Sequence, residues 1–369
     1  MDFQFFKSWN SGYCSLLNLM ADSFDLRQFS RREFLRFSGA ALISVLALNR
    51  TSFAYADSGI QQNSTALLGR ITKKRLDLFD IPSKKGKVIR ELALDEVLSI
   101  TNTAIGSDDS TNNRIWYELN GEGFIHSGVV QPVANNPNDL VTDIPASGLL
   151  AEVSVPFTDA VYDLQNPEET IRLYFSTTHW ILGVTKDSAG KWWYEVLEDF
   201  YQKSYYVTPK HLRVIPLNEL TPLSPQVPAI EKRIEVRLAD QLVIAYEGDA
   251  QVQLFRCSAG VNKADISLTP VGNFTTDYKR PSRHMIDGND HQMNTFNLPG
   301  VPWISYLDVN GISFHGTYWH NNYGVAMSHG CINLPPDSAK WIYRWTNPIV
   351  GVGEQRGYKM MGGTRVTIK

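Results

Sequence analysis

Short runs of alternating hydrophobic and polar residues recur along the chain, and such alternation is typical of β-strands that are buried on one face. It is clearest in residues 88–100 and 170–184, and it returns in residues 233–238 and 241–246. Turn-forming residues follow several of these runs, as in Asp187–Gly190. The pattern predicts a mainly β protein with few helices.

Two segments, residues 66–133 and 148–216, look like copies of one another. Ile115–Leu119 in the first matches Trp192–Val196 in the second, and a short β-rich piece follows in both. Each segment reads as about five short strands, which is enough for a small barrel. The Trp-Tyr block and the strand after it resemble bacterial SH3-like domains. This resemblance implies either modules that bind wall polymers or spacers that position the rest of the chain.

Polar, proline-containing stretches separate these segments from each other and from the C-terminal part. Residues 135–139 lie between the two copies, and residues 217–228, with three prolines, precede the last segment. Residues 229–369 then form a third, β-rich domain. Within it, Pro335–Trp345 predicts a short amphipathic helix, because proline suits the first helical turn and the apolar positions that follow share one face.

A cysteine stands among small residues near the C-terminus, in the run Ser328–Asn333, and His315 precedes it. A thiolate attacks acyl carbons at neutral pH when an imidazole takes its proton and backbone N–H groups hold the oxyanion. Cys331 is therefore the candidate nucleophile and His315 the candidate base. Gly330 lets the backbone approach a reacting carbonyl. The carbonyl of Gly316 is placed to accept from the second imidazole nitrogen and fix the tautomer.

These motifs resemble the catalytic signature of the L,D-transpeptidases of the YkuD type, in which a histidine precedes a Ser/Thr-His-Gly-Cys block. Thr269–Phe274 resembles a second landmark of that family, a Thr-Pro-x-Gly-x-Phe turn. It follows Cys257–Gly260, which is similar to the family's Ser-Thr-Gly strand end. The resemblance covers residues 229–369. It implies a β-rich catalytic domain with one or two short helices, and neither a cofactor nor a metal.

The resemblance also implies roles for individual residues. Cys331 is the nucleophile and His315 the general base, oriented by Gly316. Backbone amides around the nucleophile form the oxyanion hole, and neighbouring side chains contact the substrate. The oxyanion group is the backbone around His329, Gly330 and Cys331, and the substrate group is Ser328, Asn333 and Tyr318.

The activity that the resemblance implies is acyl transfer on peptidoglycan stem peptides. Cys331 attacks the carbonyl of a diamino acid, a terminal D-alanine leaves, and the acyl group passes to the side-chain amine of a second stem. If water accepts the acyl group, the same residues give an L,D-carboxypeptidase. A different class is a wall-binding scaffold in which the two repeated segments carry the function, although the intact Cys331 and His315 argue against it.

Two polar loops are expected beside the site. Residues 318–323 lie between base and nucleophile, in a segment shorter than the family usually has, and are expected to line the donor site. Residues 278–297 read as a lid or as a solvated surface loop. If they form a lid, Arg280 and Arg283 are candidates to meet the acidic stem peptide.

Other interpretations of single residues remain open at this stage. Asn333 either donates to the substrate or caps the helix that follows. Zinc is an alternative for the histidines near the thiol, because imidazole and thiolate are its preferred ligands, but the usual paired motifs are absent. The set in question is His315, His320, His329 and Cys331. Cys257 ends an apolar strand and is expected to be a buried core residue.

The N-terminus predicts export. Ser30–Arg36 holds a twin arginine, residues 39–48 carry no charge, and Ala54–Ala56 offers small residues where a signal peptidase cleaves. Residues 1–56 resemble a twin-arginine signal, so the protein is expected outside the cytoplasmic membrane, with membrane contact only through an uncleaved leader. The formal net charge of −3 gives no indication of nucleic acid binding.

Overall fold

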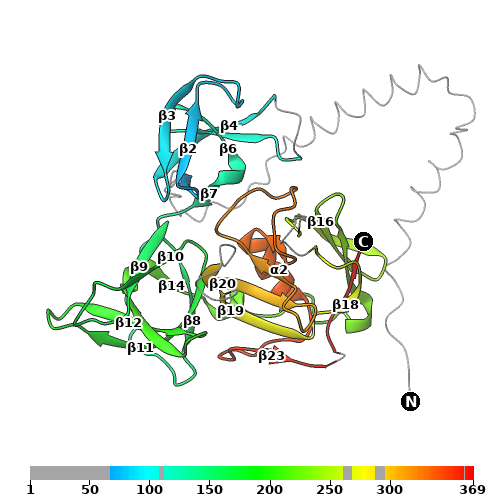
Figure 1. Cartoon of the computed structure of the whole chain (residues 1–369). Helices are drawn as coiled ribbons and strands as arrows, with labels where there is room; N and C mark the ends of the chain where they lie inside the picture. Colours follow the sequence, from blue (N-terminus) through cyan, green and yellow to red (C-terminus); the bar gives the residue numbers. More distant parts are fainter. Residues whose placement is uncertain (1–66, 108–111, 261–267, 287–295, 361) are drawn as a thin grey trace, which may run out of the picture. The chain divides into compact units, whose positions relative to one another are not determined.

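The computed structural model describes residues 67–107, 112–260, 268–286, 296–360 and 362–369. These residues are mainly β, as predicted, with one α-helix, α2, in the described part of the chain (Figure 1). The export signal predicted for residues 1–56 lies outside the described residues.

The first β-domain, residues 67–133, is a seven-stranded antiparallel sheet in the order β3-β2-β6-β5-β4-β1-β7. Alternate residues of its strands point inward and form a small hydrophobic core, which includes Leu78, Leu92 and Ile125. The short 3-10 helix η2 leads into the last strand. The elements are β1 (Leu68–Ile71), β2 (Arg75–Phe79), β3 (Val88–Ala93), β4 (Val97–Ile105), β5 (Ile115–Leu119), β6 (Gly123–His126), η2 (Ser127–Val129) and β7 (Val130–Val133).

The second β-domain, residues 148–216, repeats this fold. Its seven strands have the order β10-β9-β13-β12-β11-β8-β14, so that β8–β14 correspond one by one to β1–β7. The two segments that look like copies in the sequence thus have the same strand order, with more strands in each than the pattern predicted. The elements are β8 (Leu149–Val153), β9 (Phe157–Val161), β10 (Thr170–Tyr174), β11 (Thr178–Lys186), β12 (Trp192–Glu198), β13 (Lys203–Val207), η3 (Pro209–His211) and β14 (Leu212–Val214).

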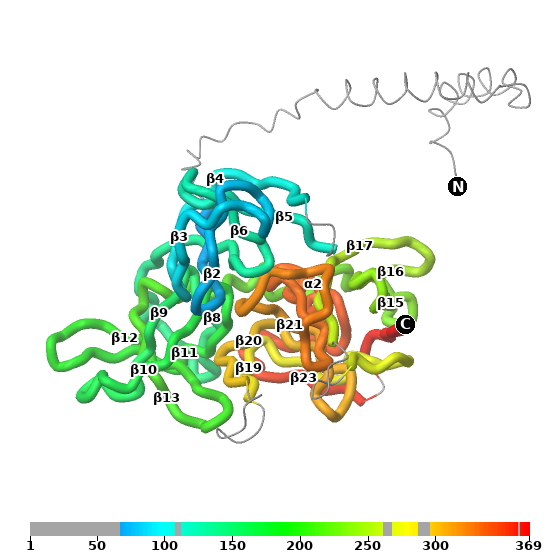
Figure 2. Tube along the Cα trace, turned by 45° about the horizontal axis from the view of Figure 1, so that its top comes forward, coloured from blue at the N-terminus to red at the C-terminus, as the bar shows by residue number. Residues whose placement is uncertain are grey.

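The C-terminal domain, residues 229–369, has two five-stranded sheets, in the orders β17-β16-β15-β24-β18 and β22-β21-β20-β19-β23. Figure 2 shows β19, β20 and β21 side by side, next to α2. The elements are η5 (Ala229–Glu231), β15 (Lys232–Arg237), β16 (Leu242–Glu247), β17 (Ala250–Arg256), β18 (Gly272–Thr275), β19 (Tyr278–Ile286), β20 (Asn297–Tyr306), β21 (Ser313–Gly316), β22 (Ile332–Leu334), α2 (Pro336–Trp345), β23 (Gly357–Tyr358) and β24 (Arg365–Ile368).

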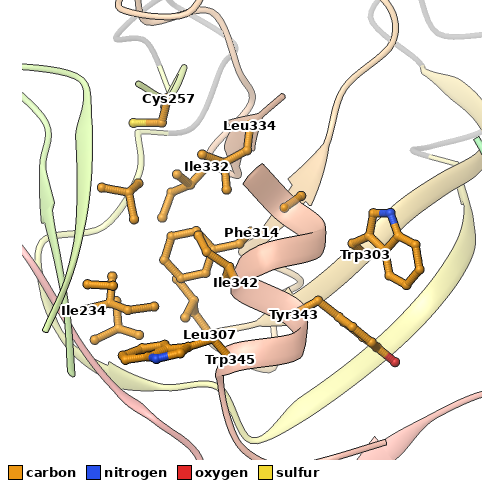
Figure 3. Close-up of a cluster of buried hydrophobic side chains, with 14 of the residues drawn as sticks. Ile234, Cys257, Trp303, Leu307, Phe314, Ile332, Leu334, Ile342, Tyr343 and Trp345 are labelled. Carbon is orange, nitrogen blue, oxygen red and sulfur yellow. The ribbon is translucent and has the colours of Figure 1, made fainter. Parts of the chain in front are cut away.

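The helix predicted from Pro335–Trp345 is confirmed as α2, with a proline in its first turn. Its apolar face, including Ile342 and Trp345, packs into the largest hydrophobic cluster among the described residues (Figure 3). The buried ammonium of Lys279 donates to the carbonyl oxygens of Tyr343 and Thr346, which ends the helix with satisfied acceptors. Helix α2 thereby supports β21 and β22, the strands next to the candidate site.

The first part of the segment expected to be a lid or a surface loop is a β-strand. Residues 278–286 form β19 and pair antiparallel with β20, which begins at Asn297. The expectation of a loop across residues 278–297 is therefore wrong for both of its ends, since these residues satisfy their backbone groups in a sheet. The intervening residues 287–295 lie outside the described part.

The proline-containing segment before the C-terminal domain packs against it. Arg213 of β14 donates to Glu219 at 2.7 Å, and the ammonium of Lys340 on α2 binds the same carboxylate. The N–H of Leu223 donates to the carbonyl oxygen of Arg344 at 3.0 Å.

Within the described residues, no helix has the length and apolar character needed to cross a bilayer.

Candidate active site

The candidate base and nucleophile lie on neighbouring strands. His315 is part of β21, Cys331 directly precedes β22, and the two strands pair in parallel with His315 opposite Asn333. Because parallel partners run in the same direction, the residue before β22 lies beside the start of β21. The Oγ of Ser313, which begins β21, is accordingly 3.6 Å from the Sγ of Cys331.

The environment of the Cys331 thiol favours its ionised form. The residue is partly buried, and its Sγ is 3.5 Å from the carbonyl oxygen of Gly311. Burial opposes ionisation, but the hydrogen bond and charge of His315, assisted by Ser313, outweigh it and lower the pKa of Cys331 below its ordinary value. A lower pKa raises the fraction of thiolate at neutral pH, and the thiolate is the nucleophilic form.

The imidazole of His315 has a defined tautomer. The side chain is 3% exposed, and its Nδ1 donates to the carbonyl oxygen of Gly316 at 3.0 Å. Since the neutral ring carries one proton, Nε2 is left as an acceptor. The contact expected from the sequence is present, and it leaves His315 able to take a proton from a thiol.

Gly316 is also required by packing. A Cβ at this position would lie 2.7 Å from Cγ of Pro302 and 3.1 Å from Cα of Pro336. The first distance is too short for two carbon atoms, so any side chain here would push β21 away from β20 or from α2. The glycine thus holds the strand of the base close to its neighbours while its carbonyl accepts from His315.

The side chain of Ser328 closes the turn before the nucleophile. Its hydroxyl donates to the carbonyl oxygen of Cys331 and accepts from the N–H of Gly330 at 3.1 Å. The residue is 4% exposed. The hydroxyl that was predicted to contact the substrate is therefore engaged within the turn.

The use of the Gly330 amide by Ser328 changes the candidate oxyanion hole. Gly330 has φ of +121°, a value that favours glycine, and its N–H points to the Ser328 hydroxyl rather than outward. The resemblance placed the hole at the amides around His329, Gly330 and Cys331. The geometry leaves the backbone amides of His329 and Cys331 as the candidate donors.

Thr269 fixes the peptide bond that precedes the nucleophile. Its Oγ1 donates to the carbonyl oxygen of Gly330 at 2.7 Å and accepts from the N–H of Gly260 at 2.8 Å. In a trans peptide the C=O and the following N–H point in opposite directions. Holding the Gly330 carbonyl on Thr269 therefore turns the N–H of Cys331 away from Thr269, as an oxyanion donor requires.

His329 and His320 have contrasting environments. His329 is exposed, and its ring lies 5.8 Å from the ring of Phe296. His320 is buried, and burial lowers its pKa to about 3, so that its ring is neutral. Its Nδ1 accepts from the N–H of Asn322 at 3.2 Å, and its Nε2 faces the side-chain amide of Asn333 at 3.1 Å. His320 therefore has a structural role.

Neither the helix cap proposed for Asn333 nor the zinc site proposed for the histidines fits the structure. The N-cap of α2 is Pro335, with no side-chain hydrogen bond, so the prediction that Asn333 caps the helix is wrong. Asn333 is 3% exposed, and its amide faces His320 rather than an open surface. In the described segments, no three His, Cys, Asp or Glu side chains converge as a metal ligand set.

Tyr318, predicted to contact the substrate, is buried against the second β-domain. It is 3% exposed, its ring stacks on that of Tyr174, and its hydroxyl donates to the carbonyl oxygen of Pro299 at 3.2 Å. Trp319, the next residue, is the aromatic side chain that lies near the base, with ring centroids 5.8 Å from His315. Tyr318 therefore contacts the second β-domain, whereas Trp319 contacts the active site.

The two arginines expected to meet an acidic peptide are paired within the protein. Arg280 and Arg283 lie 2.9 and 2.8 Å from the carboxylate of Asp199, which follows β12 of the second β-domain. Next to them, His284 contacts the buried carboxylate of Glu198. This cluster attaches β19 to the second β-domain, so the arginines are not free for substrate.

The two described cysteines differ in chemical state. Both are free thiols, and Cys257 is fully buried, as expected. Burial raises the pKa of Cys257 to about 12, whereas that of Cys331 is lowered. Cys331 is therefore the reactive thiol of this pair.

Two polar residues of the site received no role from the sequence. The turn motif gives Thr269 no catalytic role, and no motif marks Ser313. A signal for Ser313 exists, because residues two apart in a strand share one face, so Ser313 and His315 point the same way from β21.

Comparison with known proteins places the C-terminal domain in a family. Residues 231–368 match the model of the YkuD family, the L,D-transpeptidase catalytic domain. The comparison with curated proteins gave no significant match. Residues 231–368 therefore match an L,D-transpeptidase catalytic domain, and the family match is confined to this part of the chain.

Several solved structures are similar to this chain. One is an L,D-transpeptidase from Mycobacterium smegmatis, with 23% identity, a TM-score of 0.31, and coverage of 38% of this chain and 58% of that chain. A mutant of the Enterococcus faecium L,D-transpeptidase has 23% identity and a TM-score of 0.30, over 38% of this chain and 50% of that chain. The E. faecium catalytic domain solved by NMR has 24% identity and a TM-score of 0.28, over 37% of this chain and 96% of that chain. The chain thus spans just over half of the first of these proteins and half of the second.

Proposed function

We propose that this chain is an exported cysteine acyltransferase that forms L,D cross-links between peptidoglycan stem peptides. The observation that carries the proposal is the pairing of Cys331 with His315. The pKa of the thiol is lowered by the imidazole, and the pair lies in a domain that matches the L,D-transpeptidase catalytic family.

In the acylation step, Nε2 of His315 takes the thiol proton, because Nδ1 is committed to the Gly316 carbonyl. The Cys331 thiolate attacks the carbonyl carbon of a diamino acid, and the oxyanion accepts from the amides of His329 and Cys331. The C–N bond to the terminal D-alanine breaks, and the protonated His315 supplies the proton to the leaving amine. The product is a thioester on Cys331.

In the second step, an acceptor attacks the thioester carbon. If the acceptor is the side-chain amine of another stem, His315 takes its proton, the C–S bond breaks, and an amide cross-link forms. If water attacks instead, the product is a shortened stem with a free carboxylate. The carboxypeptidase reaction is therefore the alternative outcome of the same intermediate.

The remaining parts of the proposal concern location and partners. The twin-arginine-like leader motivates export to the cell wall or periplasm. The repeated β-domains, proposed as SH3-like, provide the part of the chain available for wall polymer. Peptidoglycan is then both the substrate and the binding partner.

The test is muropeptide analysis. The mature protein, starting at Asp57, is incubated with disaccharide-tetrapeptides, and products are separated by chromatography and mass spectrometry. A cross-linked dimer supports the proposal, and a tripeptide alone supports the carboxypeptidase. No product from a folded protein would favour the scaffold.

The matched control uses the second cysteine. Cys331→Ala should abolish product, since it removes the nucleophile and little buried volume. Cys257→Ala should remain active, because the buried, protonated thiol takes no part. An essential Cys257 with a dispensable Cys331 would refute the assignment.

A further inference from the structure

The loop that joins base to nucleophile, residues 317–327 (the connecting loop), is held by the first β-domain. Nη2 of Arg70 in β1 donates to the carbonyl oxygen of Tyr318 at 2.7 Å. Arg70 is 2% exposed, and its Nη1 is 2.6 Å from the carboxylate of Asp95. A buried guanidinium paired in this way has little freedom to move. The Tyr318 carbonyl is therefore bonded to a fixed donor.

Two further contacts fix the guanidinium of Arg70. Its Nε and Nη2 donate to Oε1 of Gln131 at 3.0 and 2.8 Å. Its plane lies over the ring of Tyr174, 4.1 Å from the centroid. Because Tyr174 also stacks on Tyr318, the loop is held through both its backbone and its ring.

A second anchor holds the middle of the connecting loop. The N–H of Asn321 donates to the carbonyl oxygen of Gly128 at 3.0 Å, and Nδ2 of Asn113 donates to Oδ1 of Asn322 at 3.0 Å. The approach at Gly128 is close, since a Cβ there would lie 2.7 to 2.8 Å from side-chain atoms of Asn322. The first β-domain thus contacts the loop at two separate points.

Two residues at the beginning of this loop, one just before it and one within it, contact the base. The carbonyl of Gly316, one residue before the loop, accepts from Nδ1 of His315, and the Trp319 ring lies beside the imidazole. Tyr318, bonded to Arg70, lies between these two contacts in sequence. A shift of Tyr318 would therefore move both groups that orient His315.

We propose that the first β-domain positions the catalytic base, with Arg70 and Gly128 as positioning residues that act through the connecting loop. This rests on the proposed function, in which His315 ionises Cys331. On this view the domain does more than tether or space the enzyme, because it completes the active site. A displaced base costs rate even where every catalytic residue is present.

The first test weakens the arginine anchor in the full mature chain. Arg70→Gln is compared with Arg90→Gln, which removes two more exposed ion pairs of the same domain, to Glu96 and Glu122. The readouts are the rate of Cys331 alkylation by iodoacetamide as a function of pH, and kcat and KM for muropeptides. We expect Arg70→Gln to raise the apparent pKa of the thiol and to lower kcat by on the order of 10- to 100-fold. Arg90→Gln should follow the wild type.

The second test perturbs the loop without touching the buried ion pair, in case Arg70→Gln does not fold. Gly128→Ala places a Cβ too close to Asn322. Gly183→Ala adds a Cβ 3.5 Å from the carboxylate of Glu195, which is an ordinary van der Waals distance. Gly128→Ala should shift the alkylation profile in the same direction as Arg70→Gln. Gly183→Ala should not.

The outcomes separate this inference from the proposed function. If wild-type protein is alkylated at a depressed pKa but makes no muropeptide product, the proposed function fails. If wild type is active and both Arg70→Gln and Gly128→Ala keep its alkylation profile and kcat, the positioning role is overturned. A lower melting temperature with unchanged profile and kcat also overturns it, because the contacts would then be purely structural.

Discussion

Tyr318 stacks on Tyr174, with ring centroids 5.2 Å apart and planes inclined by 25°. The first belongs to the connecting loop of the catalytic domain and the second to β10 of the second β-domain. Together with the bond from Arg70 to the Tyr318 carbonyl, this stack makes a contact shared by all three domains. The behaviour of the active site is therefore expected to depend on the whole folded chain.

The two thiols of the mature protein should react very differently. Iodoacetamide at neutral pH is expected to add once to the native protein, on Cys331, since the pKa of that thiol is lowered and that of Cys257 is raised to about 12. Intact-protein mass spectrometry should show one adduct in native buffer and two in denaturant. Cys331→Ala should show none when native. A native adduct that persists in Cys331→Ala would place the reactive thiol elsewhere.

Loss of the base should lower turnover far more than loss of its buried neighbour. His315→Gln is expected to reduce kcat by about 10²- to 10⁴-fold, the usual effect of a positioned base. His320→Gln should change the melting temperature more than the pH dependence, because the pKa of His320 is about 3 and its ring stays neutral. Steady-state kinetics across pH checks both variants, and the reverse order of effects would move the base to His320.

The hydroxyl of Thr269 should matter for catalysis although it is absent from the catalytic pair. Thr269→Val keeps the shape but releases the Gly330 carbonyl and with it the orientation of the Cys331 amide. We expect kcat to fall by about 10-fold or more, since complete loss of an oxyanion donor costs roughly 10²- to 10³-fold. Thr269→Ser retains the hydroxyl and should retain activity. Equal kcat in both variants would argue against an oxyanion role for this peptide.

The buried pair of Glu198 and His284 should make stability depend on pH. Burial alone would lower the pKa of His284, but hydrogen bonds to Glu198 and Asn297 raise it; the pKa of Glu198 is lowered despite its burial. A raised histidine pKa stabilises the fold below the unfolded value near 6.5, and this contribution is lost as pH rises through the folded pKa. The glutamate contributes above about 4.5 and loses its contribution as pH falls through its lowered folded pKa.

Glu198→Gln should therefore lower the free energy of unfolding most at about pH 5.5, between the unfolded pKa values of glutamate and histidine. The expected loss is roughly 3 kcal/mol, as for breaking a buried ion pair, and it should shrink toward about pH 8.5. Urea unfolding at both pH values measures it. Glu122→Gln, on an exposed pair with Arg90, should have a small effect that is the same at both. A pH-independent loss in Glu198→Gln would mean that the pair is not ionised.

Local patterns predicted what depends on neighbours in sequence. Alternation predicted the strands, and proline with apolar spacing predicted α2, whereas the resemblance to the YkuD signature implied the proximity of His315 to Cys331. The contact between His315 and Gly316 was predictable for the same reason, because it joins adjacent residues.

Contacts between domains could not be predicted in this way. Tyr318 and Arg280 looked available for substrate because nothing near them in sequence covers them, yet Tyr174 and Asp199 of the second β-domain do. Ser328 was assigned to the substrate for a different reason, since a hydroxyl beside a nucleophile can form hydrogen bonds either within a turn or to a substrate. Periodicity reports which face is buried and does not report which partner buries it.

The matching strand order of the two β-domains makes their positions comparable. Arg70 in β1 lies opposite Gln131 of β7, and at the equivalent place Glu152 in β8 lies opposite Arg213 of β14. One copy thus presents a cation to the connecting loop, while in the other a carboxylate holds Arg213, which in turn binds Glu219 beside α2. The two copies therefore carry side chains of opposite charge at this equivalent strand position, Arg70 in β1 and Glu152 in β8. Exchanging the order of the two β-domains would place the carboxylate of Glu152 against the carbonyl of Tyr318. Neither β-domain could therefore replace the other.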